Sequence, residues 1–93
     1  MLKGNTDTLL LALLQVEPMY GYQIVKEVNK KSSGYFAFKE GTLYPALHRL
    51  EKARLIEGRW EDTPNNVRRR YYLITARGQL ALADRLSEWR KFS

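Results

Sequence analysis

The sequence predicts a mainly α-helical domain that carries one small β-hairpin. Apolar residues recur at helical spacing in the first half of the chain, alternate with polar residues further on, and return to helical spacing near the end. The helices are expected at about 5–16, 20–31, 42–52 and 76–92, and the hairpin at about 55–74. With no linker or repeat, the whole chain (1–93) is expected to form a single domain.

Composition narrows the functional classes. Sixteen Lys and Arg against ten Asp and Glu give a net charge of +6, which favours an anionic partner, although solubility alone accounts for such a charge equally well. There is no cysteine for a disulfide and no His and acidic cluster for a metal, so no cofactor is expected. The apolar run at 9–14 is too short to cross a membrane and lacks a signal-peptide cleavage site. We therefore expect a cytoplasmic protein.

The first helix, at 5–16, is stopped by Pro18. Its leucines lie nearly all round the helix, with Leu10 and Leu14 about 100° away from the main apolar stripe. A small domain is expected to cover one side of such a helix and to leave the other for a second molecule. Leu10 and Leu14 are therefore predicted to belong to a dimer interface.

The second helix, at 20–31, places its branched apolar residues toward the core. Gly21 lies on the same side, and its cost within a helix suggests the close approach of another backbone. Tyr22 and Lys26 face away at i, i+4 spacing and suit contact with phosphate, because the helix before a recognition helix crosses the DNA backbone. For Tyr22, shielding of the core is an equal alternative.

The third helix carries the strongest signal. Leu43, Ala46, Leu47 and Leu50 form an apolar stripe at i, i+3, i+4 and i+7. The opposite face offers hydrogen-bond donors and flat groups instead of a Glu and Lys mixture, which is typical of a recognition helix. The exposed residues of this face are Tyr44, Pro45, His48, Arg49 and Lys52. Alternatives are a surface histidine without a role at 48 and partial packing of Tyr44.

The hairpin follows as two alternating segments around a polar turn at 62–66. Three helices and then a two-stranded hairpin make the winged helix-turn-helix arrangement, with the hairpin as the wing. Arg68, Arg69 and Arg70 come directly after the turn, and alternation puts Arg68 and Arg70 on one face and Arg69 on the other. Arginine forks suit phosphate oxygens, so we expect DNA contacts here. The alternative is a solvated charge run that protects a sheet edge.

The last helix, at 76–92, is expected to be capped by Thr75. It presents Leu82, Leu86 and Trp89 as an apolar stripe, which Phe92 extends. Exposed on a small domain, this stripe predicts homodimerisation together with the first helix. A two-fold dimer would place two recognition helices on two half-sites of double-stranded DNA. Two Trp89 side chains near the dyad would also sandwich a flat aromatic ligand, with plain interface packing as the alternative.

Several motifs in this order resemble the PadR-like transcriptional regulators. They are LKG at 2–4, YGY at 20–22, EGTLYPALHRLE at 40–51, RRYYLIT at 69–75 and EWR at 88–90. The resemblance implies a homodimeric winged-helix repressor of a palindromic operator, released in many relatives by small phenolic or aromatic compounds. It also implies which residues bind DNA: Tyr22, Thr42, Tyr44, Pro45, His48 and Arg49 on the helices, and Asn65, Asn66, Arg68, Arg69 and Arg70 on the wing.

Three departures from the family pattern stand out. Arg54 occupies a position where relatives often have glycine, the preferred left-handed helix cap, so a strained or altered end of the third helix is expected. The wing tip at 64–67 lacks the glycines common in relatives. Because the chain stops at Ser93, it resembles the short branch of the family, with one dimerisation helix and no separate C-terminal domain.

The same residues are compatible with two other classes of function. One alternative is an architectural or non-sequence-specific DNA-binding dimer, and another is a protein-interaction module without an effector. An enzyme is not expected, because a single histidine, no cysteine and no suitably spaced acidic pair leave no catalytic constellation.

Overall fold

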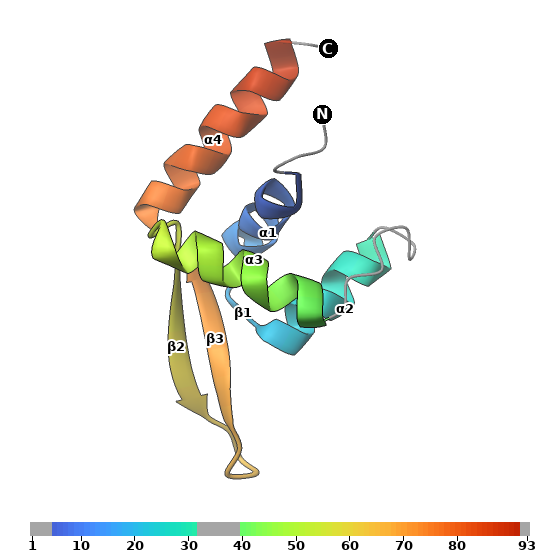
Figure 1. Cartoon of the computed structure of the whole chain (residues 1–93), viewed down its shortest axis with the longest axis vertical. Helices are drawn as coiled ribbons and strands as arrows, with labels where there is room; N and C mark the ends of the chain where they lie inside the picture. The colour runs from blue at the N-terminus through green and yellow to red at the C-terminus, as the bar shows by residue number, and fades with distance from the viewer. Residues whose placement is uncertain (1–4, 32–39, 92–93) are drawn as a thin grey trace.

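The computed structural model describes residues 5–31 and 40–91 and confirms the predicted fold class (Figure 1). The elements are α1 (Asn5–Val16), β1 (Met19–Tyr20), α2 (Gly21–Lys31), α3 (Glu40–Lys52), β2 (Ile56–Asp62), β3 (Arg68–Ile74) and α4 (Ala76–Lys91). The aromatic run at 35–38, a short strand by its sequence, lies outside the described residues.

Helix α1 lies at the centre of the fold, where it packs against α2, α3, α4 and β3 (Figure 1). Leu10 and Leu14 are therefore 0% and 2% exposed within the single chain. The prediction that these two leucines belong to a dimer interface is wrong. Other elements of the same chain cover the sides of α1 on which Leu10 and Leu14 lie. None of the described helices is long and apolar enough to cross a membrane.

The sheet has three antiparallel strands in the order β1-β3-β2, one more than the predicted hairpin. Strand β1 pairs Met19 with Tyr72 and Tyr20 with Tyr71, so residue 20 belongs to a strand and not to α2. A two-residue strand is too short to show alternation, and its pairing with β3 depends on backbone groups. In the hairpin formed by β2 and β3, the residue pairs run from Ile56 and Ile74 at the base to Asp62 and Arg68 near the turn. The hairpin projects from the helices (Figure 1).

The end of α3 has the strained conformation expected from Arg54, whose φ is 64°. The Leu55 N–H donates to the Leu50 carbonyl at 2.9 Å, and the Arg54 N–H donates to the Glu51 carbonyl at 2.9 Å. This pair of bonds is the Schellman motif, in which the left-handed position usually holds glycine. The motif turns the chain directly from α3 into β2.

Helix α4 begins on the same turn. Thr75 caps it as predicted, because the Gly78 N–H donates to Thr75 Oγ1 at 3.0 Å. The Thr75 N–H also donates to the Leu55 carbonyl at 3.1 Å. From there α4 runs beside α1, where Arg85 donates to Thr8 at 3.4 Å. The cap thus fixes α4 to the connection between α3 and the wing.

Candidate nucleic-acid interface

The outer face of α3 is exposed as predicted. Leu43, Ala46, Leu47 and Leu50 are buried in the core, which leaves the opposite side of the helix open. The exposed residues of that side are Tyr44, Pro45, His48, Arg49 and Lys52. The side chain of Thr42 lies outside the described residues.

The two flanks of this face have different neighbours. At about 100° per residue, Tyr44 and Glu51 lie on one flank and Arg49 on the other. Arg49 Nη2 lies 3.0 Å from Asp7 Oδ1 of α1, while 60% of the Arg49 side chain stays exposed. The guanidinium is therefore oriented by Asp7 and still reachable from outside, a partner that sequence reasoning missed because 42 residues separate the two.

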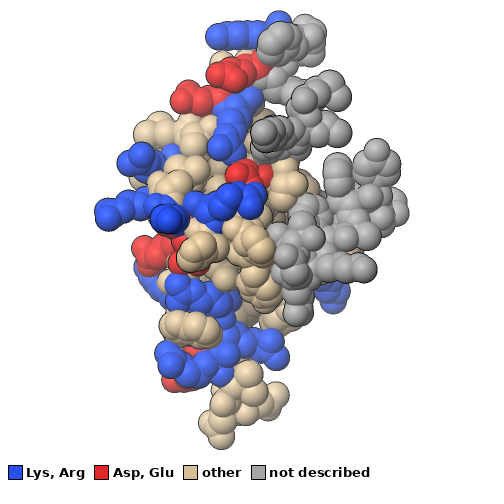
Figure 2. Space-filling model, viewed as in Figure 1, with Lys and Arg blue, Asp and Glu red and all other residues tan. Residues whose placement is uncertain are grey.

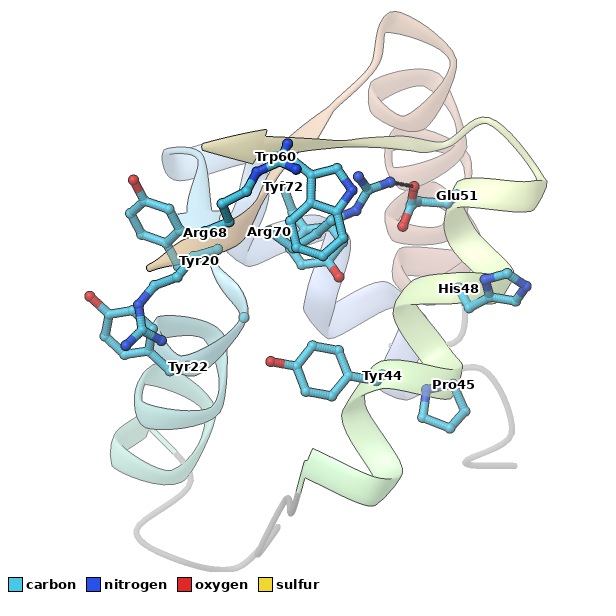
Figure 3. Close-up of a pocket in the computed structure, with 12 residues that line it drawn as sticks. Tyr20, Tyr22, Tyr44, Pro45, His48, Glu51, Trp60, Arg68, Arg70 and Tyr72 are labelled. Atoms are coloured by element: carbon cyan, nitrogen blue, oxygen red, sulfur yellow. Dashed lines mark hydrogen bonds and ion pairs between the residues drawn. The ribbon is translucent and has the colours of Figure 1, made fainter. Parts of the chain in front are cut away.

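Between α3, the start of α2 and the wing lies a cleft of about 680 Å³ (Figure 3). Its walls combine aromatic rings with arginines, and Glu51 is the acidic residue among them. The lining residues are Tyr20, Gly21, Tyr22, Tyr44, Pro45, His48, Glu51, Trp60, Arg68, Arg69, Arg70 and Tyr72. The structure thus brings residues predicted from three separate segments to one surface.

Tyr44 is half-exposed and lies against Gly21 (Figure 3). A Cβ atom added at Gly21 would be 2.6 Å from the Tyr44 hydroxyl oxygen and 3.0 Å from its Cε1. The expected approach of another backbone to Gly21 is therefore wrong: a phenol ring takes the space that the missing side chain leaves.

The three arginines of the wing follow the predicted alternation. The guanidinium carbons of Arg68 and Arg70 lie 5.4 and 5.1 Å from the ring centre of Trp60, on one face of the hairpin. The guanidinium carbon of Arg69 lies 5.0 Å from the ring centre of Tyr22, on the other face. These are cation–π distances, so each arginine is oriented by an aromatic ring. Arg68 also makes an exposed ion pair with Asp62 at 3.6 Å.

Arg70 differs from its neighbours because it is paired and partly buried. Its Nη2 lies 2.8 Å from Glu51 Oε2 at the end of α3, with the two side chains 28% and 25% exposed (Figure 3). Tyr72 is buried beside them. Burial, followed by the nearby Glu51 carboxylate, raises the pKa of the Tyr72 hydroxyl, and Arg70 opposes that shift.

Tyr22 supports Arg69 from within an aromatic stack. The Tyr20 and Tyr22 rings are stacked with centroids 5.9 Å apart, and Tyr20 meets Tyr71 of β3 at 4.7 Å. About half of Tyr22 remains exposed, so this residue packs against Tyr20 and is still accessible to a ligand.

Exposed cations gather over the wing and the neighbouring end of α3 (Figure 2). No described carboxylate pairs with Lys26, Lys52, Arg54 or Arg69. At the wing tip, Asn65 and Asn66 are exposed in a turn. Asn66 has a φ of 60°, a left-handed conformation that asparagine tolerates better than most residues.

The outer face of α4 is partly apolar. Leu86 is 41% exposed and Leu80 is 71% exposed, but Leu82 is buried against α1, so its predicted place in a dimer interface is wrong. Leu82 follows the inner side of α4, whereas Leu86 borders an open groove of about 430 Å³ with Gln15 of α1. The Trp89 side chain and Phe92 lie outside the described residues. Among the described residues, no group of His, Asp and Glu is suited to hold a metal ion.

Glu51, Trp60 and Tyr72 were not predicted as site residues. The signal that could have found them is alternation, which puts Gly58 and Trp60 on one side of their strand and Arg70 and Tyr72 on one side of theirs. The missing information was the register, which sets Trp60 opposite Arg70 and Gly58 opposite Tyr72.

Comparisons with known proteins give a consistent result. Residues 10–84 match the family described as "Transcriptional regulator PadR-like family". A transcriptional regulator from Clostridium thermocellum is 35% identical with a TM-score of 0.87, covering 98% of this chain and 88% of that one. A PadR-like transcriptional regulator from Bacillus cereus is 33% identical with a TM-score of 0.84, covering 99% and 87%. Bacillus subtilis PadR, solved in complex with operator DNA, shares the fold at a TM-score of 0.79 and 23% identity, covering 87% and 46%.

Proposed function

The chain belongs to the PadR-like family of transcriptional regulators, and from that premise we propose that it binds double-stranded operator DNA through α3 and the wing as a homodimeric repressor. The family assignment agrees with the prediction that the chain is not an enzyme. The solved complex of Bacillus subtilis PadR with operator DNA supports the proposal through the shared fold.

One observation carries the DNA-binding proposal: the exposed side of α3 and the arginines of the wing border the same cleft. Recognition helices enter the major groove and wings contact the flanking backbone, so the two elements have to be presented on one side of the molecule. His48 and Arg49 are the exposed donors suited to base edges, and Lys52 and Arg69 are cations suited to phosphates.

The proposed dimer uses the outer face of α4. Leu80 and Leu86 are exposed on this helix, and Val16 at the end of α1 is 78% exposed. Apolar surface of this kind on a small domain favours association with a second copy. A two-fold dimer repeats the DNA-binding surface twice, which is why we propose a palindromic operator. The proposed effector is a small aromatic compound, as the family resemblance implies, and its proposed place is between the two Trp89 side chains near the dyad.

Salt dependence of DNA binding tests the phosphate contacts. We expect Lys52→Ala and Arg69→Ala each to reduce the slope of log affinity against log salt by about 0.9. Lys91→Ala removes the same charge from the far end of α4 and serves as the matched control, with an unchanged slope. Equal slopes for all three variants and the wild type would remove Lys52 and Arg69 from the interface.

Base reading is tested separately at Arg49. Arg49→Ala should weaken binding to a preferred sequence by about 1–3 kcal/mol while affinity for random DNA changes little. Asp7→Asn, which releases the guanidinium without removing it, is the control for a purely orienting effect. If Arg49→Ala lowers both affinities equally, Arg49 is not a base reader.

A further inference from the structure

We propose that Arg70 acts in DNA binding as a positioning residue: its ion pair with Glu51 fixes the wing relative to α3, and its guanidinium does not contact DNA. This inference rests on the proposed function, and it changes the role that the sequence predicts for Arg70. We call the two residues the wing clamp.

The ion pair itself is the first observation. Arg70 Nη2 donates to Glu51 Oε2 at 2.8 Å, and among the described residues this is the ion pair that joins α3 to the wing. The Arg70 side chain is 28% exposed, compared with 65% for Arg68 on the same face of β3. A guanidinium held by a partly buried carboxylate has fewer donors left for phosphate than its exposed neighbour.

Gly58 is the second, independent observation. A Cβ atom added there would lie 2.7 Å from Arg70 Nε and 2.9 Å from Glu51 Oε2. The backbone of β2 therefore leaves the space through which Arg70 reaches α3. The centre of the Trp60 ring lies 5.1 Å from the guanidinium carbon of Arg70, so two residues of β2, Gly58 and Trp60, hold the Arg70 side chain in place (Figure 3).

The wing clamp lies back from the tip of the hairpin, so a small rotation at the clamp displaces the tip by a larger distance. At the base of the hairpin, Ile56 and Tyr72 are buried, whereas beyond Trp60 and Arg70 both strands are exposed. Arg70 lies four positions along the chain from Asn66 at the tip, a span of about 13 Å at strand spacing. A rotation of about 10° at the clamp would move the tip by about 2 Å over that length, so a wing without the clamp has to be ordered before its tip can hydrogen-bond to a phosphate.

The decisive test is the sign of the effect of Glu51→Gln. Removing a negative charge near DNA raises affinity if only charge matters. The proposal predicts the opposite, a fall of about three- to tenfold, because the loosened wing has to be ordered on DNA at a cost in entropy. The salt slope stays unchanged, because the ordered wing then makes the same phosphate contacts. Affinity is measured by fluorescence anisotropy with one labelled duplex over a range of salt. An affinity equal to or above that of the wild type would overturn the proposal.

Arg70→Gln should reproduce both results, and the double variant should be no weaker than either single variant, because both changes break one interaction. Arg68→Gln, an exposed arginine two residues away, is the matched control. If it contacts phosphate, it lowers the salt slope by about 0.9. A comparable drop in slope for Arg70→Gln would show that Arg70 contacts DNA directly.

Gly58→Ala breaks the wing clamp without changing any charge. The added methyl group meets the ends of two flexible side chains, so the pair moves while the fold is kept. We expect the same fall in affinity as for Glu51→Gln, and wild-type affinity for Gly58→Ala would contradict the role of the pair.

A measurement without DNA separates failure of the wing clamp from failure of the proposed function. In all three clamp variants, NMR relaxation of the Trp60 indole N–H should report faster motion than in the wild type. Unchanged relaxation overturns the clamp even if DNA binding stands. If wild-type protein binds no DNA, the proposed function fails, and the relaxation data still decide whether the pair orders the wing.

Discussion

Gly78→Ala offers a strong test of how the wing and α4 are joined. Gly78 is buried in the first turn of α4, against the turn that connects α3 to β2. A Cβ atom added there would overlap the carbonyl oxygen of Leu55 and lie 3.0 Å from the Leu55 carbonyl carbon. Backbone atoms cannot rotate away, so either α4 or the connecting turn has to shift.

The magnitude follows from three contributions. Overpacking costs about 1–3 kcal/mol. The shift also strains the Thr75 hydrogen bond to Leu55, worth about 1 kcal/mol. These two losses are partly offset, because alanine stabilises a helix by about 0.5–1 kcal/mol relative to glycine. We therefore expect a net loss of about 2 kcal/mol, which lowers Tm by about 8–16 °C in a domain of this size.

Gly21→Ala is the matched control, since it is also a glycine in the first turn of a helix. Its added methyl group meets the end of the Tyr44 side chain, which can move outward. We expect its stability to stay within about 1 kcal/mol of the wild type. Urea unfolding followed by circular dichroism at one fixed protein concentration compares the three proteins. Equal losses in both variants would refute the distinction between backbone and side-chain neighbours.

Three further predictions concern single residues. Arg54→Gly should raise the free energy of unfolding by about 1 kcal/mol, because glycine adopts the left-handed conformation without strain; unchanged urea midpoints would contradict this. The raised pKa of Tyr72 means that its contribution to stability is complete below pH 10, the ordinary value, and is lost as pH rises through the folded-state value. Tyr72→Phe should therefore reduce the loss of stability above pH 10, and an unchanged profile would contradict this. Leu86→Asp should give a folded monomer in sedimentation velocity, because Leu86 is 41% exposed on α4; a persistent dimer would place the interface elsewhere.

Local patterns predicted much of this fold. The i, i+3, i+4, i+7 stripe of α3 identifies both its buried and its exposed side, and alternation correctly separates Arg69 from Arg68 and Arg70. Thr75 was predicted as a cap because capping depends on residues three positions apart. These features are set by neighbours in sequence, so no knowledge of tertiary structure is needed.

The wrong or missing predictions concern residues whose surroundings are set by tertiary contacts. Leu10 and Leu14 look like interface residues until α1 is seen to be enclosed by four other elements. Gly21 meets a phenol ring from α3, which no local pattern identifies. The pairing of Arg70 with Glu51 depends on which face of the hairpin turns toward α3, a choice that alternation alone leaves open.

Sequencing of DNA that the purified protein selects from a random pool tests the central claim most directly. A dimer that presents α3 and the wing twice predicts an enriched inverted repeat, with half-sites about 10 bp apart or a multiple of that spacing. Enrichment of a single asymmetric site, or no enrichment above the starting pool, would contradict it.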